Sequence, residues 1–158
     1  MQTFRSAAHP DGRSAAHMHG RALVRPLAAC MLPVMIVTLV AVLEGRRILP
    51  ALAAASVGAL LLSSAWVHFQ LRRTPAVIYV TDGYAAVRSV WHVLQGQRSG
   101  LNWMPVLDVR ERSSGVRATI GYESFALDEA DWPDHGRLID ALVNALHHSS
   151  RSVAPEEA

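Results

Sequence analysis

The sequence has little of what catalytic and metal-binding proteins usually carry. It holds a single cysteine, Cys30, so no internal disulfide can form. No glycine-rich phosphate loop follows an expected strand, no Gly-x-Ser-x-Gly elbow occurs, and the cysteine and histidines lack the spacing of a zinc site. We therefore expect a protein that is not an enzyme and that binds no metal.

Charge is divided unevenly between the two halves of the chain. Residues 1–73 carry eight arginines against Asp11 and Glu44, a net charge of +6, whereas residues 74–158 carry seven arginines against eleven acids, a net charge of −4. An acidic polar half lacks the basic footprint of a nucleic-acid-binding surface. We expect no nucleic-acid partner.

Two apolar runs, residues 27–43 and 48–71, are separated by only four residues. Their 17 and 24 residues contain no charge, and at ~1.5 Å per residue each can cross a hydrocarbon core ~30 Å thick. The pattern predicts a two-helix transmembrane hairpin over residues 22–73. Residues 1–21 have no apolar period, which predicts a flexible N-terminal tail.

Arginines flank this hairpin on both sides. Arg21 and Arg25 precede the first run, Arg72 and Arg73 follow the second, and Glu44 partly offsets the loop arginines. Because arginine favours the cytoplasmic side, four against two predicts both termini in the cytoplasm. The expected membrane-interface residues are Arg46, Arg47, Trp66, His68, Arg72 and Arg73.

His68 allows a second interpretation. An imidazole inside a membrane segment can ligate a haem or a chlorophyll-type pigment, and polar residues deep in the membrane mark such sites. His68 lies only three residues from the end of the apolar run. We therefore expect no cofactor, with a pigment or haem near His68 as the alternative.

Small residues recur along the second apolar run at a spacing that places them on one helix face. In lipid, close approach of backbones along such a stripe drives helix association. The stripe either packs on the first helix of the hairpin or docks onto another integral membrane protein. Its residues are Ala51, Ala55, Gly58, Ala59 and Ser63.

After Pro75 the apolar period changes from helical to alternating. The alternation predicts an antiparallel sheet, and the three- and four-residue spacing of Leu138, Ile139, Leu142 and Leu146 predicts a closing helix that covers its apolar face. The expected strands are residues 76–80, 84–94, 103–112, 116–120 and 124–127. The chain is thus expected to be an α+β membrane protein with a small cytoplasmic domain over residues 74–148 and a tail over residues 149–158.

Basic residues of this domain form a candidate binding face. A face of this kind near an anionic membrane gains roughly 1 kcal/mol per basic residue, and the alternative is a solvated surface. Its residues are Arg88, His92, Arg110, Arg112 and Arg117.

Several segments together resemble the bacterial pleckstrin-homology-like (PH-like) domain. They are the run at residues 79–83, Val87-Arg88, the run at residues 102–105, the strands about Gly115 and the helix that follows Trp132. The layout, two membrane helices followed by such a domain, is similar to that of photosynthetic complex assembly proteins. The resemblance implies a reduced PH-like scaffold in the bacterial inner membrane that binds lipids or proteins and does no chemistry.

Three functions follow in order of preference. The first is a non-catalytic accessory or assembly subunit of a larger membrane complex, respiratory or photosynthetic. The second is a membrane-surface module that recognises anionic lipids. The third is a small membrane-bound enzyme that uses His92 or the carboxylates of residues 128–134, although 75 residues rarely form a pocket of convergent polar groups.

Overall fold

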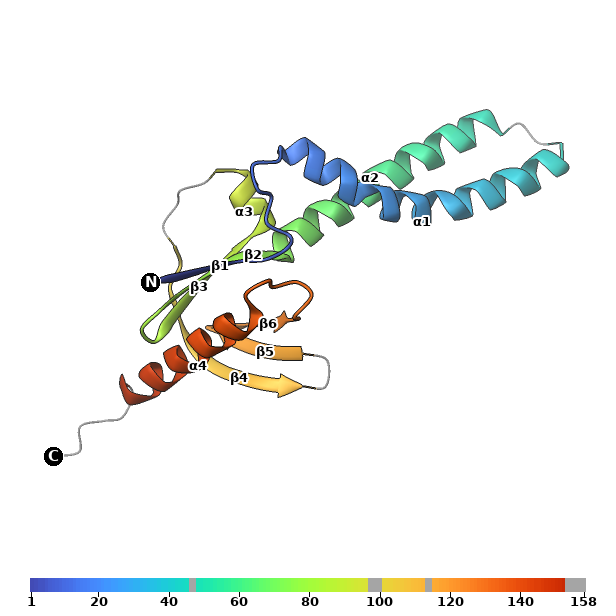
Figure 1. Ribbon diagram of the computed structural model, residues 1–158. Coiled ribbons are helices and arrows are strands. Elements are labelled where there is room, and N and C mark those ends of the chain that lie inside the picture. The colour runs from blue at the N-terminus through green and yellow to red at the C-terminus, as the bar shows by residue number, and fades with distance from the viewer. Residues whose placement is uncertain (46–47, 97–100, 113–114, 153–158) are drawn as a thin grey trace. The chain divides into compact units, whose positions relative to one another are not determined.

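The computed structural model describes residues 1–45, 48–96, 101–112 and 115–152. It is an α+β structure with two long apolar helices, a sheet of antiparallel strands and a C-terminal helix (Figure 1). The chain divides into two units: residues 12–73 form the apolar hairpin, and residues 1–11 together with 74–158 form the sheet unit. The sequence predicts the two apolar helices correctly, but it misses the return of the N-terminal residues to the sheet.

The apolar hairpin consists of α1 (Ala15–Leu43) and α2 (Leu49–Arg73), which pack against each other. The side chain of Ser14 caps α1 by accepting a hydrogen bond from the backbone N–H of His17. After α1, Gly45 takes a φ of +68°, which glycine adopts without strain. Both helices are long and apolar enough to cross a membrane, and no residue of α1 is buried.

The sheet unit is a six-stranded antiparallel meander in chain order. The short helix α3 (Val90–Leu94) follows the third strand, and α4 (His135–Ser152) follows the last. The strands are β1 (Gln2–Arg5), β2 (Pro75–Thr81), β3 (Tyr84–Ser89), β4 (Met104–Arg112), β5 (Gly115–Ile120) and β6 (Glu123–Leu127).

The expectation of a flexible tail over residues 1–21 is wrong. Gln2–Arg5 form β1, which pairs with β2 in the register Gln2↔Val80 to Arg5↔Val77. Phe4 is 4 % exposed and belongs to the apolar core, and the hydroxyl of Ser6 donates to the carbonyl of Pro75 at 2.8 Å. Four residues are too few to show a strand period in the sequence, and burial of Phe4 stabilises the pairing.

The expectation of a strand over residues 84–94 is also wrong in its second half. The strand ends at Ser89, whose side chain accepts from the backbone N–H of His92 and begins α3. The N–H of Val90 donates to the carbonyl of Thr74 at 2.9 Å. The Ser89 cap therefore favours a helix over residues 90–94, although the alternation of apolar residues there favours a strand.

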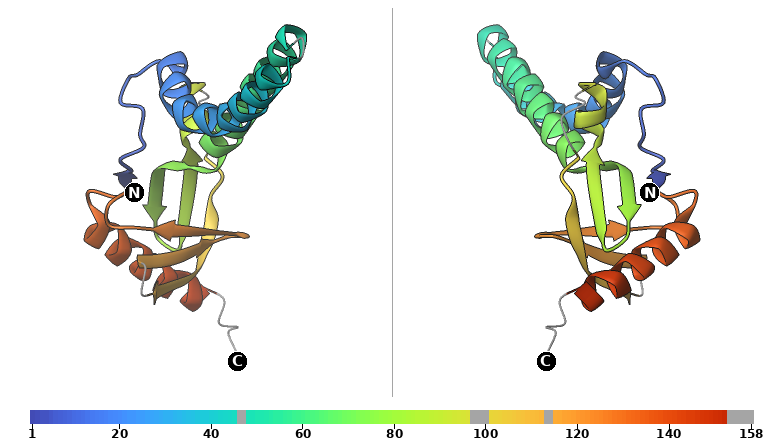
Figure 2. Two further views of the ribbon diagram at one scale, coloured as in Figure 1. Left: turned by 90° about the vertical axis from the view of Figure 1, so that its right-hand side faces the viewer. Right: turned by 90° about the vertical axis from the view of Figure 1, so that its left-hand side faces the viewer.

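Strand β4 is shared by two halves of the sheet. Met104 and Pro105 pair with β3, and from Val106 onward the strand pairs with β5. The register shifts between Val106 and Asp108, as at a β-bulge, and bulges increase strand twist. Figure 2 shows the strands of the second half running steeply across those of the first.

Helix α4 covers the apolar face of the sheet (Figures 1 and 2). Leu138 and Leu142 are fully buried, and Ile139 and Leu146 pack against the core, so the predicted apolar stripe is confirmed. The helix runs to Ser152, and the hydroxyl of Ser149 donates to the carbonyl of Val106 at 2.9 Å. The expectation of a tail from residue 149 is therefore wrong for its first four residues, and residues 153–158 lie outside the described residues.

Candidate functional site

The end of α2 carries the residues expected at a membrane interface. Trp66 is exposed, His68 is half-buried, and the guanidinium of Arg73 lies 4.1 Å from the ring centroid of Phe69. Arg72 is exposed beside it, in the last turn of the helix. A cation over an aromatic ring at the end of an apolar helix suits a polar boundary. The other two expected interface residues, Arg46 and Arg47, lie outside the described residues.

The small-residue stripe of α2 lies partly inside the hairpin. Ala59 is 7 % exposed and Ser63 is fully buried, with its hydroxyl donating to the carbonyl of Ala59 at 2.7 Å. Ala51 and Ala55 line a cavity of about 330 Å³ together with Pro33, Val37 and other residues of α1. A Cβ added at Gly58 would meet nothing within 4 Å. The stripe therefore faces α1 at Ala51 and Ala55, whereas Gly58 lies in open space.

A second, more open groove of about 870 Å³ lies mainly along α1. Its lining is almost wholly apolar and includes Leu52 of α2. Leu32, Met35, Ile36 and Leu39 are all more than half exposed. We call this surface the α1 face; its α1 residues are Ala28, Met31, Leu32, Met35, Ile36, Thr38, Leu39 and Val42.

The candidate basic face is not one surface. Arg110 and Arg117 are directly opposite each other on β4 and β5, and both are exposed. The guanidinium of Arg110 lies 2.8 Å from the carboxylate of Asp108, which offsets part of its charge. Arg112 is the last residue of β4, and its side chain lies outside the described part of the chain.

Arg88 and His92 lie elsewhere. Arg88 is four residues beyond Tyr84, and Arg110 is five residues beyond Pro105, the partner of Tyr84 in the antiparallel pair. The two arginines therefore extend in opposite directions from this pair, by as much as ~30 Å in total at ~3.3 Å per residue. His92 is on α3, where its Nδ1 lies 2.8 Å from the Ser89 hydroxyl. The expectation of one face containing all five residues is wrong.

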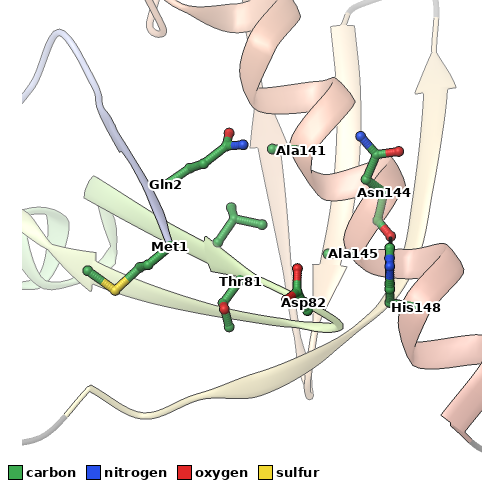
Figure 3. Close-up of a pocket in the computed structure, with 9 residues that line it drawn as sticks. Met1, Gln2, Thr81, Asp82, Ala141, Asn144, Ala145 and His148 are labelled. Carbon is green, nitrogen blue, oxygen red and sulfur yellow. Dashed lines mark hydrogen bonds between the residues drawn. The ribbon is translucent and has the colours of Figure 1, made fainter.

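A pocket of about 110 Å³ with both polar and apolar lining lies between β1 and α4, at the β2–β3 turn. Gln2 contributes from β1, Asp82 from the turn, and Asn144 and His148 from α4 (Figure 3). Val80, Ala141 and Ala145 form its apolar part. Sequence reasoning missed this pocket because it did not predict β1, which with the residue before it supplies Gln2 and Met1 to the lining.

Chemistry-bearing clusters are scarce in the described part of the chain. Among its residues, no group of three or more His, Cys, Asp or Glu side chains is placed to hold a metal ion. His9 and Asp11 form a pair, with Nδ1 2.8 Å from the carboxylate, on the segment between β1 and α1. His135 pairs with the carbonyl of Leu127.

Comparisons of the chain with models of protein families, with curated proteins and with solved structures found no match. The resemblance to PH-like domains therefore stays a prediction.

Proposed function

We propose that this protein is a non-catalytic accessory or assembly subunit that anchors a PH-like domain to a larger membrane protein complex, respiratory or photosynthetic. The observation that supports this most is the α1 face. In the described hairpin, α2 packs on one side of α1, and the groove along the α1 face is bordered by α2 at Leu52. Helix association in lipid depends on packing, and a groove on one side of a helix offers a place for another helix.

The position of the hairpin within the chain supports an anchoring role. It is inserted between β1 and β2, which are neighbours in one sheet. If both helices cross the bilayer, this pairing requires that the chain enter and leave the membrane on the same side. The arginine distribution favours the cytoplasmic side. The sheet unit is then held by two chain connections rather than one.

The α1 face also contains Met31 and Met35. Methionine side chains are flexible and polarisable and adapt to irregular partner surfaces. Lipid chains would fill the groove when no partner is bound, so docking exchanges lipid contacts for helix contacts without a large hydrophobic gain. Filling the groove should therefore remove the partner without removing the protein from the membrane.

The test is a mild-detergent pull-down of the tagged full-length chain, with mass spectrometry and an absorption spectrum of the eluate. We expect a membrane protein partner in stoichiometric amount. Ala28→Phe, which places a ring in the groove, should lower its recovery about tenfold, equivalent to ~1.4 kcal/mol. The spectrum shows whether a pigment or haem accompanies the partner, and a coloured eluate makes His68 the residue to replace.

The matched control is Val57→Phe. Val57 is exposed on α2 and does not line the groove, so this variant adds the same ring at a similar hydrophobic position. It should retain the partner. Wild-type protein that elutes alone or as a homo-oligomer would contradict the proposal, as would equal recovery with both variants.

A further inference from the structure

The first strand of the sheet has one open edge. The N–H of Ser6 donates to the carbonyl of Ala76 at 2.9 Å, so Ser6 is a hydrogen-bonded position of the β1–β2 ladder. Hydrogen-bonded positions alternate along an antiparallel strand. Gln2 and Phe4 therefore direct their backbone groups toward β2, whereas Thr3 and Arg5 direct theirs outward. No strand in the described part of the chain pairs with this edge.

The open edge borders the pocket between β1 and α4. Helix α4 begins near the end of β1, where the N–H of Ala7 donates to the carbonyl of Asp131. It ends near the β2–β3 turn, where a Cβ on Gly83 would lie 3.4 Å from the backbone N of Ser149. The helix thus runs alongside β1, and a strand added to β1 would lie next to the pocket.

Donors and acceptors both line the pocket, and its acceptors come chiefly from Asp82, Asn144 and His148. His148 Nδ1 lies 2.7 Å from the carbonyl oxygen of Asn144, which can only accept, so Nδ1 carries a proton and Nε2 of the neutral ring is an acceptor. Asp82 contributes a carboxylate, which Figure 3 shows directed into the space between the strands and α4. The last turns of α4, next to the pocket, carry the negative end of the helix dipole.

The apolar part of the pocket is formed by small side chains. Ala141 and Ala145 place only methyl groups on the α4 side, and Val80 lies opposite. A volume of about 110 Å³ is comparable to cavities that hold one small ring, so it suits the stem of a single side chain. A lysine or arginine has an apolar stem and a cationic head, which match these two kinds of lining.

We propose that the edge of β1 and the adjacent pocket bind an extended segment of a partner polypeptide, with one lysine or arginine side chain in the pocket. The partner strand pairs with the outward backbone groups of Thr3 and Arg5, which supply two donors and two acceptors. Its cationic side chain meets Asp82 and the acceptors of Asn144 and His148. This proposal does not depend on which protein the α1 face contacts.

The test uses the full-length chain in nanodiscs of uncharged lipid and a fluorescent blocked peptide, Thr-Val-Lys-Val-Thr, in an anisotropy titration. We expect the same peptide with Glu in place of Lys to bind about tenfold more weakly. Thr3→Pro should also weaken binding of the Lys peptide about tenfold, because it removes an outward donor and leaves the β1–β2 hydrogen bonds intact.

A second variant keeps the test independent of strand β1. Asp82→Asn should weaken the Lys peptide about fivefold and leave the Glu peptide unchanged or slightly improved. Its control is Glu129→Gln, which removes one exposed negative charge outside the pocket and should change nothing. The proposal would be overturned if the Lys peptide did not bind at millimolar concentration, or if the Lys and Glu peptides bound equally. It would also be overturned if two copies of the chain formed a dimer that the peptide does not disperse.

Discussion

Replacing Trp132 with alanine is expected to destabilise the sheet unit by about 3–5 kcal/mol, the range for removing a fully buried large aromatic side chain. Trp132 is 2 % exposed and belongs to the core beneath α4. Domains of this size have about 5–15 kcal/mol of stability in total, so the loss leaves little reserve. Hydrogen exchange of the strand amides of the full-length chain, followed by mass spectrometry, should show protection lost throughout the sheet.

Tyr122→Ala is the matched control. It also removes an aromatic ring, but Tyr122 is 102 % exposed at the turn between β5 and β6. Substitutions at such surface positions usually change stability by less than ~0.5 kcal/mol. Equal loss of protection in the two variants would show that the core is not organised around Trp132.

Replacing Met35 with arginine is expected to prevent stable integration of the chain in membranes. Met35 lies near the middle of the first apolar run and is 67 % exposed. At the centre of a membrane-spanning helix an arginine costs about 2.5–3.5 kcal/mol, which corresponds to roughly a hundredfold change in the insertion equilibrium. On a helix in water the same change would be neutral.

The fraction that resists alkaline carbonate extraction after translation into membranes measures this effect. The control is Leu107→Arg, which introduces the same charge at an exposed apolar position of β4 and should leave the extracted fraction unchanged. If Met35→Arg remains as fully membrane-integrated as the wild type, α1 does not span the bilayer.

The main feature that the sequence analysis missed, strand β1, depends on pairing between residues that are far apart in the chain. The apolar runs specify α1 and α2 directly, and the stripe through Leu138 and Leu142 specifies α4, because these signals are local and extend over many residues. Strand β1 has only four residues, and its partner Val77 follows more than seventy residues later. What stabilises β1 is the burial of Phe4 in the core of the folded sheet, and the sequence alone does not show this burial.

The candidate basic face shows the same difference between local and long-range signals. Of the five residues predicted to share a basic face, Arg110 and Arg117 are directly opposite each other on β4 and β5. Arg88 lies away from them because, in the described part of the chain, β3 pairs with β4 only at Tyr84 and Ala85. His92 does not lie on that face because it belongs to α3, which begins where the side chain of Ser89 caps the helix.

The apolar hairpin is an insertion within one sheet, between the paired strands β1 and β2. If both helices cross the bilayer, β1 and β2 meet on one side of it. Thr3 and Tyr79 are directly opposite each other at a non-hydrogen-bonded position. Such pairs have Cα atoms ~4.5 Å apart, within the range that a disulfide spans. Thr3→Cys with Tyr79→Cys, in a Cys30→Ser background, therefore reports the pairing.

The measurement is oxidation of this variant in intact membranes, followed by solubilisation and cleavage at a protease site introduced between the two helices. We predict that the two fragments stay joined until a reductant is added. In the control, Thr3→Cys with Ser124→Cys on the opposite edge strand, they should separate without reductant. Separation of the fragments in the Thr3–Tyr79 variant as well would show that β1 does not pair with β2 in the membrane-bound protein.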